Sequence, residues 1–190
     1  MGRKSILKLI LIAIMSIFAV FLVVIIVFFG GFRFPNKSNI VGFPNKEAYF
    51  FMSPSDLTKQ CGDPNEIVAD TLTPYDFYHY TENILGIESN TTYDFYRSPF
   101  GKYLTRTHSD TPVSSVEQGK DVVSKIYNQI SDVYSGRTDY YNNGIKESNF
   151  YDIQYIEADL GIKHGATGIY INIKYSSSSN EVRVDVVEMS

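Results

Sequence analysis

The stretch Val116–Tyr134, VEQGKDVVSKIYNQISDVY, decides the fold that the sequence predicts. Its apolar residues recur at steps of three and four, which places them on one face of a helix. They are Val116, Val123, Ile126, Tyr127, Ile130, Val133 and Tyr134. Ser115 and Gln118 suit a capping box at its start, and Asp121 and Lys125 are spaced for an ion pair on its polar side. The stretch therefore predicts one long helix with an apolar face.

Three segments after this helix alternate apolar and polar residues, as strands with one buried face do. They cover residues 151–155, 169–175 and 182–186. The intervening stretch 138–149 is rich in Tyr and Asn and contains Asn143-Gly144, so we expect a polar loop with a turn there. Together these patterns predict an antiparallel sheet that packs on helices along one side.

The chain before the long helix predicts a short helix and several aromatic strands. Ser53 can cap a helix that has Pro54 in its first turn, and Gly62 can end it. Period-two patterns rich in Tyr and Phe follow at residues 67–69, 75–80, 92–97 and 100–107. Cys61 falls on the apolar face of the short helix, which favours a small buried residue over a nucleophile. As the single cysteine it can form no internal disulfide.

The apolar run Leu9–Phe32 holds 24 residues without a charge and lies between Lys8 and Arg33. About 20 helical residues cross the hydrocarbon core of a bilayer, so the run predicts a transmembrane helix. Arg3 and Lys4 add to the basic flank before it, which predicts a cytoplasmic N-terminus and an extracytoplasmic remainder. The run is longer and ends more bulkily than a cleaved signal peptide. Cleavage remains the alternative to an uncleaved signal-anchor.

These segments predict a domain organisation and a fold class. The expected parts are a basic cytoplasmic N-terminus (1–8), a transmembrane helix (9–32), a juxtamembrane linker (33–48) and an extracytoplasmic α+β domain (49–190), with possible halves at 49–112 and 113–190. The linker carries two Phe-Pro-Asn-Lys copies, whose prolines oppose a helix. The domain is expected to hold an antiparallel sheet packed on one long and one short helix, BLIP-like or cystatin-like.

Charge and motifs argue against several kinds of site. All 21 acidic residues and 14 of the 17 basic residues lie beyond Phe32, which gives this part a formal charge of −7 and disfavours nucleic acid. The three histidines, His79, His108 and His164, have no partners at metal-ligand spacing. The glycine-rich stretch 161–168 resembles a phosphate loop, but a strand pattern follows it where a P-loop needs a helix. We therefore expect no catalytic, cofactor-binding or metal-ligating residues.

The strand Tyr75–Tyr80, YDFYHY, predicts a contact surface. Alternation puts Tyr75, Phe77 and His79 on one face and Tyr78 and Tyr80 on the other. With large rings on both faces, one set is expected near the surface, and we predict Tyr78 and Tyr80 as possible partner-binding residues. The alternative is that the long helix and the 138–149 loop cover both faces.

Residues Ser53–Thr107 carry a family resemblance. The short helix Ser55–Cys61, the corner Gly62-Asp-Pro-Asn-Glu-Ile67, the strand Tyr75–Tyr80 and the segment Phe100-Gly-Lys-Tyr-Leu-Thr105 are similar to the SmpA/OmlA (BamE-like) envelope family, and more broadly to the β-lactamase-inhibitor-protein-like fold. The chain lacks the lipid-bearing cysteine of those lipoproteins. The resemblance implies a binding or assembly domain outside the cytoplasm, with no catalytic residues.

The sequence thus predicts a membrane-anchored extracytoplasmic module that binds protein or assembles the envelope and is not an enzyme. Its expected partners are membrane lipid, through residues 9–32, and another envelope or membrane protein. The alternatives are a sensor or accessory subunit of a membrane complex, and an inhibitor or immunity protein.

Overall fold

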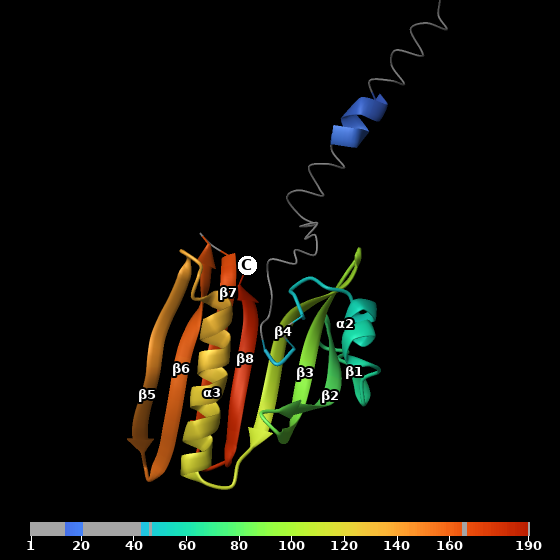
Figure 1. Cartoon of the computed structure of the whole chain (residues 1–190). Coiled ribbons are helices and arrows are strands. Elements are labelled where there is room, and N and C mark those ends of the chain that lie inside the picture. The colour runs from blue at the N-terminus through green and yellow to red at the C-terminus, as the bar shows by residue number, and fades with distance from the viewer. Residues whose placement is uncertain (1–13, 21–42, 46, 165–166, 190) are drawn as a thin grey trace, which may run out of the picture. The chain divides into compact units, whose positions relative to one another are not determined.

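A computed structural model describes residues 14–20, 43–45, 47–164 and 167–189. The chain divides into two units, Met1–Phe34 and Pro35–Ser190, and the helices and strands labelled in Figure 1 all belong to the second. Their order is α2 (Pro54–Cys61), β1 (Glu66–Ala69), β2 (Tyr75–Ile84), β3 (Ile87–Ser98), β4 (Gly101–Pro112), α3 (Val116–Tyr134), β5 (Tyr140–Phe150), β6 (Ile153–His164), β7 (Thr167–Ser176) and β8 (Glu181–Met189).

The strands form one eight-stranded antiparallel sheet in the order β1-β2-β3-β4-β8-β7-β6-β5. Each half of the chain is a helix followed by a four-stranded meander. The last strands of the two meanders, β4 and β8, pair with each other at the centre of the sheet. Because this pairing is antiparallel, the second half repeats the first about an approximate two-fold axis through the sheet between β4 and β8.

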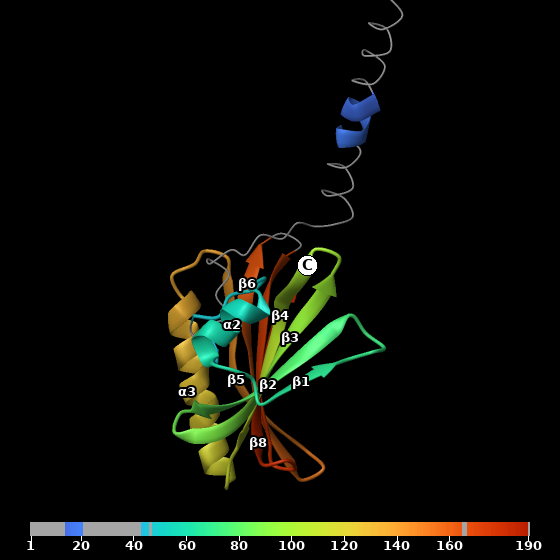
Figure 2. The ribbon, with the colours of Figure 1, turned by 90° about the vertical axis from the view of Figure 1, so that its right-hand side faces the viewer.

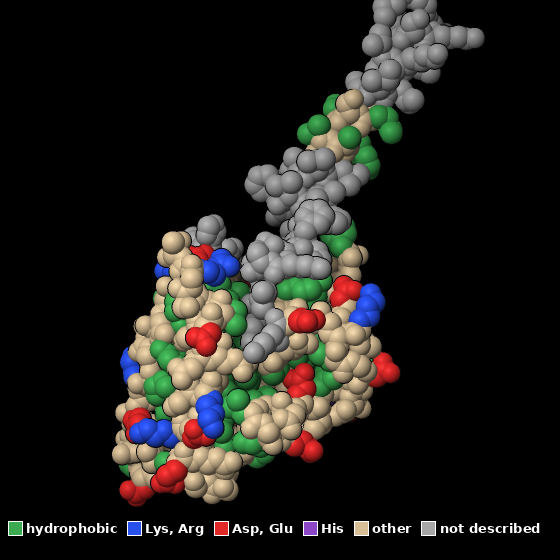
Figure 3. All heavy atoms as spheres, in the orientation of Figure 1, with side chains coloured by type: hydrophobic (Ala, Val, Ile, Leu, Met, Phe, Trp, Pro, Cys, Tyr) green, Lys and Arg blue, Asp and Glu red, His purple; other side chains and the backbone are tan. Residues whose placement is uncertain are grey.

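Both helices pack on the same face of the sheet (Figure 2), and their apolar residues share one core. Leu57 of α2 and Ile126 and Ile130 of α3 are fully buried in it. On this side of the molecule, charges of both signs are interspersed over the surface (Figure 3). A surface of that kind is typical of a solvated helix face.

The predicted helix at Val116–Tyr134 is confirmed as α3, including its cap. The backbone N–H of Gln118 donates to Ser115 Oγ at 3.2 Å, and Lys125 pairs with Asp121 at 2.7 Å. The buried face lies slightly to one side of the predicted stripe, because Gly119 and Val122 are buried while Val133 is exposed. The short helix is also confirmed, with Ser53 at its N-cap and Gly62 at its C-cap.

The expected fold class is wrong. A transmembrane helix followed by an α+β domain of BLIP-like or cystatin-like form was predicted, whereas the described chain is mostly one continuous eight-stranded sheet with short helices. The difference arises partly at residues 138–149, which we expected to form a loop. They form most of β5, because its backbone pairs with β6 despite the Asn-rich sequence. A bulge between Asn142 and Ile145 takes up the Asn-Gly turn.

The membrane prediction is corrected as well. Within the described residues, the structure contains no helix that combines the length and the apolar character needed to cross a membrane. Of the run 9–32, residues 14–20 are helical, and the others lie outside the described residues. The membrane, transmembrane and signal-anchor assignments and the single-pass localisation depended on that helix, and they are withdrawn with it.

The end of the expected linker belongs to the core. Phe43 and Ala48 are buried, as are Phe50 and Met52 just after them. The carbonyl of Phe43 accepts a hydrogen bond from Thr107 Oγ1 of β4. The folded unit therefore includes residues that were assigned to the linker 33–48, whose residues 33–42 and 46 lie outside the described part.

Gly119 provides a test of how α3 packs. A Cβ atom there would lie 2.6 Å from Cδ2 of Tyr175, a fully buried residue of β7. In an open helix position, Gly→Ala stabilises by about 1 kcal/mol. Gly119→Ala should instead lower the free energy of unfolding by about 1 kcal/mol or more, since the ring and its neighbours have to shift.

Chemical denaturation measures this change, and Gly136→Ala is its control. Gly136 follows the helix, and a Cβ atom there would meet no other atom within 4 Å. The control should unfold within about 0.5 kcal/mol of the wild type. A Gly119→Ala protein as stable as the control would show that α3 does not contact Tyr175 as described.

Candidate functional site

Neither α2 nor α3 covers the other face of the sheet, which we call the open face. In β2, Asp76, Tyr78 and Tyr80 point toward the helices and are buried. Residues that are partners in register share a face. The open face therefore carries Tyr75, Phe77 and His79 of β2, Thr92, Asp94 and Tyr96 of β3, Tyr103, Arg106, His108 and Asp110 of β4, and Arg183 and Asp185 of β8.

A row of aromatic rings crosses the open face at one end of the first meander. Tyr75, Tyr96 and Tyr103 are register partners on β2, β3 and β4, and all three are half-buried. Their ring centroids are 5.6 Å apart between Tyr75 and Tyr96 and 5.5 Å apart between Tyr96 and Tyr103. Phe51 continues the contact, 5.8 Å from Tyr103. We call these four residues the aromatic row.

Ion pairs on the helix side brace the same end of the sheet. Asp76, only 1% exposed, lies next to Lys102 and within 3.5 Å of Arg97 Nε. The guanidinium of Arg97 also donates to the carbonyl oxygens of Asp70 and Thr73, which ties the β1–β2 turn to β3. These contacts on the helix side thus help to hold in register the strands that carry the aromatic row on the open face.

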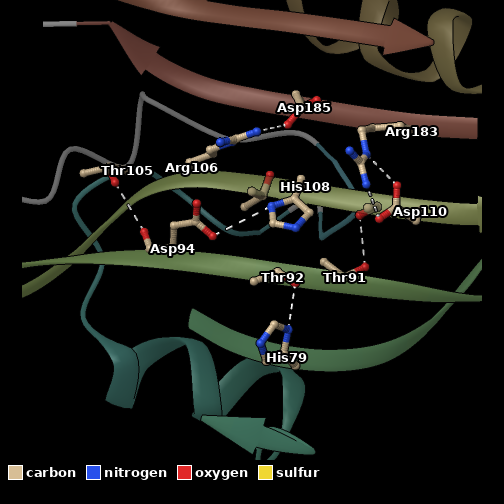
Figure 4. Close-up of polar contacts among 12 residues, drawn as sticks. His79, Thr91, Thr92, Asp94, Thr105, Arg106, His108, Asp110, Arg183 and Asp185 are labelled. Atoms are coloured by element: carbon tan, nitrogen blue, oxygen red, sulfur yellow. Dashed lines mark hydrogen bonds and ion pairs between the residues drawn. The ribbon is translucent and has the colours of Figure 1, made fainter. Parts of the chain in front are cut away.

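Charged side chains at the centre of the open face are paired with one another across β4 and β8 (Figure 4). Arg106 pairs with Asp185. Arg183 donates twice to Asp110, from Nε at 2.7 Å and from Nη2 at 2.9 Å. Such bidentate pairs fix geometry as well as charge. The centre of the open face is therefore close to neutral.

Asp94 and His108 form an unusual pair beside these charges (Figure 4). Asp94 Oδ1 lies 3.8 Å from His108 Nδ1, and among the described residues neither atom has a hydrogen-bond partner. Burial raises the pKa of Asp94 to about 7, although Arg106 opposes the rise. Burial, followed by Arg106, lowers the pKa of His108. Both shifts favour the uncharged forms, a protonated carboxyl beside a neutral imidazole.

The choice of Tyr78 and Tyr80 as surface residues was wrong. They are 8% and 5% exposed and point into the core beneath α2. The ring of Tyr78 packs on Phe95 at 4.8 Å, and that of Tyr80 packs on Tyr93 at 5.4 Å. The space between the short helix and the sheet accommodates these large rings. The alternate set, with Tyr75 and Phe77, therefore lies on the open face.

The other residues considered from the sequence lie apart from the aromatic row. Cys61 is partly buried, accepts a hydrogen bond from Asn45 Nδ2 at 3.0 Å, and has a thiol pKa raised by burial. The glycine-rich stretch divides between β6 and β7, residues 165–166 and the side chain of His164 lying outside the described part. No group of three or more His, Cys, Asp or Glu residues in the described chain could hold a metal ion.

Sequence reasoning missed the aromatic row and the Asp94–His108 pair. Tyr75, Tyr96 and Tyr103 stand in three separate strands, and no local pattern joins them. His79 and His108 both flank Thr92, and His79 Nδ1 shares a hydrogen bond of 2.9 Å with Thr92 Oγ1. Only the cross-strand register brings these residues together.

Asp94 predicts an unusual dependence of stability on pH. Its folded pKa of about 7 exceeds the ordinary value of 3.8, so between these two values the folded chain holds a proton that the unfolded chain has released. The unfolding free energy therefore falls as pH rises through this window. Asp94→Asn removes the proton exchange and mimics the neutral acid.

Denaturation of both proteins at a series of pH values measures this effect. The variant should gain on the wild type as pH rises from about 4 to about 7.5, by at most about 4 kcal/mol, since one pKa unit corresponds to about 1.4 kcal/mol. His108 acts in the opposite direction in both proteins, because burial lowers the pKa of its imidazole. A constant difference between the two proteins across this range would show that Asp94 ionises normally.

Comparison with known proteins does not assign a function. Neither the protein-family models nor the curated proteins include one that matches this chain. The resemblance of Ser53–Thr107 to the BamE-like family stays a prediction from the sequence. A function has to be inferred from the residues of the open face themselves.

Proposed function

We propose that this chain is a non-catalytic protein-binding module whose open face contacts the partner through the aromatic row. The observation that carries the proposal is that the half-buried rings of Tyr75, Tyr96 and Tyr103 pack together on a sheet face that neither α2 nor α3 covers. Assembly, sensing and inhibition, the roles considered from the sequence, all need such a contact surface.

The aromatic row has the chemistry of a protein contact. Tyr is enriched among residues that dominate binding energy, because its ring is apolar and its hydroxyl can still bond to water or to a partner. Tyr75, Tyr96 and Tyr103 already contact one another, so little side-chain freedom remains to be lost on binding. A preorganised row of this kind supports tight contact over a small area.

The charges favour a protein with a basic surface as the partner. Nucleic acid needs clustered Lys and Arg for its phosphates, but Arg106 and Arg183 are held by carboxylates of the same face. Lys174, farther along the face, is likewise paired with Glu157 at 2.7 Å. The chain beyond Phe32 has a formal charge of −7, which attracts a basic partner over a distance.

Removing two rings of the aromatic row should strongly weaken capture of the partner while the fold survives. The test variant carries Tyr75→Ser and Tyr96→Ser, two half-buried residues that lie outside the core cluster. The full chain, immobilised, is exposed to an extract of its source cells, and proteins retained by wild type are quantified for each variant. We expect at least a tenfold loss, since two hot-spot rings typically supply more than about 1.4 kcal/mol.

The control is Tyr151→Ser in the β5–β6 turn, where the side chain is 85% exposed. It removes a surface tyrosine from the opposite edge of the sheet and should leave capture unchanged. Melting curves of both variants check that the fold is intact. Undiminished capture by a well-folded Tyr75/Tyr96 variant would place the binding surface elsewhere.

A further inference from the structure

Arg106 lies between two carboxylates on the open face. Its register partner on β3 is Asp94, whose side chain is on the same face directly across the ladder. On the other side of β4, Asp185 of β8 lies diagonally opposite. Figure 4 shows the guanidinium turned toward Asp185 and away from Asp94. Side chains at register partners are about 5 Å apart at Cβ, so either carboxylate is within reach of an arginine.

The present pairing leaves Asp94 without a cation. Arg106 bonds to Asp185, while Asp94 Oδ1 is buried, accepts no hydrogen bond among the described residues and faces His108 Nδ1 at 3.8 Å. An ionised carboxylate in such a position would be strongly destabilised. Arg106, about half exposed, could relieve it by turning across β4. The contact of the guanidinium with Asp185 is the arrangement that suits a neutral, protonated Asp94.

We infer that Arg106 is a proton-controlled switch, which pairs with Asp185 while Asp94 is protonated and turns to Asp94 when that carboxyl releases its proton to solvent. The only covalent change is the loss of the O–H bond of Asp94, whose proton passes to a water molecule. The two arrangements differ in whether Arg106 ties β4 to β8 or to β3, while the pair Arg183–Asp110 joins β4 to β8 in both. A discrete exchange of partners of this kind is what a two-state element requires.

The surrounding groups are compatible with this exchange. Phe77 and His79 face Asp94 from β2, and His79 is engaged with Thr92. From β4 come Arg106 and His108, the latter with a pKa lowered by burial. Farther along the β4–β8 pairing, Arg183 is held by Asp110. Arg106 is thus the cation nearest to Asp94 that can change partner, and the raised pKa of Asp94, about 7, sets the range of the exchange near neutrality.

The switch would change the charge pattern of the open face, a consequence that rests on the proposed function. When Arg106 turns to Asp94, Asp185 loses its guanidinium and leaves an uncompensated carboxylate at the centre of the face. A basic partner would then bind more tightly above about pH 7 than below it. The affinity rises with pH because the carboxylate of Asp185, which is negative, attracts a basic partner.

Carbon-detected NMR of the full chain tests the switch without any partner. The Cγ resonance of Asp94 and the Cδ resonance of Arg106 are followed from about pH 5 to about pH 9. We expect both to shift with one common midpoint, between about 6 and about 8. In Asp94→Asn, the Arg106 resonance should keep its low-pH position throughout.

The matched control is Asp110→Asn, which removes the carboxylate that holds Arg183. It should leave the Arg106 transition within about 0.5 pH units of wild type, which is below the usual effect of a direct charge partner. A midpoint for Asp94 outside the stated range, an Arg106 resonance without a transition, or a transition that persists in Asp94→Asn would overturn the switch. These outcomes are independent of partner capture, so failure of the switch and failure of the proposed function are distinguishable.

Discussion

The pairing of β4 with β8 is the constraint on which the rest of the structure depends. It joins two four-stranded meanders into one sheet, over the register from Arg106↔Val187 to Pro112↔Glu181. On the helix side of this pairing, buried valines of β8 lie opposite buried Thr and Ser residues of β4. On the open side, the pairs Arg106–Asp185 and Arg183–Asp110 cross between the same two strands. Both faces therefore contribute to holding the halves together.

This pairing also determines where the aromatic row lies. β8 accompanies β4 only as far as Arg106, and beyond that point the segment at Phe51 and Met52 bonds to Leu104 instead. Tyr103 therefore meets Phe51 at the edge of β4, and the row of rings extends from there to β2. The proposed contact surface and the proposed switch are thus neighbours, because both are built along β4.

Local patterns in the sequence predicted the elements whose cause is local. α3 follows from residues three and four apart and from the Ser115 cap, and α2 follows from Ser53 and Gly62. β5 could not be predicted this way, because its Asn-rich residues have little strand preference and its order comes from pairing with β6. The apolar run 9–32 was the clearest pattern of all, yet the membrane assignment drawn from it was wrong.

The candidate site could not be predicted from local sequence patterns either, but for a different reason. The alternating pattern of β2 correctly placed Tyr75 and Tyr78 on opposite faces of the strand. Which of the two faces packs on the core depends on where α2 lies, and α2 is a separate segment of the chain. Asp94 and His108 are 14 positions apart in the sequence and meet only through the register of β3 with β4. Register depends on the whole meander, and no single segment encodes it.

Native-state hydrogen exchange tests most directly whether the β4–β8 pairing unites the two halves. If it does, the slowest amides of β2 and β3 and those of β6 and β7 exchange with the same free energy of opening as those of β4 and β8, because all become exposed in one global unfolding. The dependence of these rates on denaturant should also share one slope. Two groups of protected amides, one per meander, with opening free energies that differ by more than about 1 kcal/mol, would contradict this account.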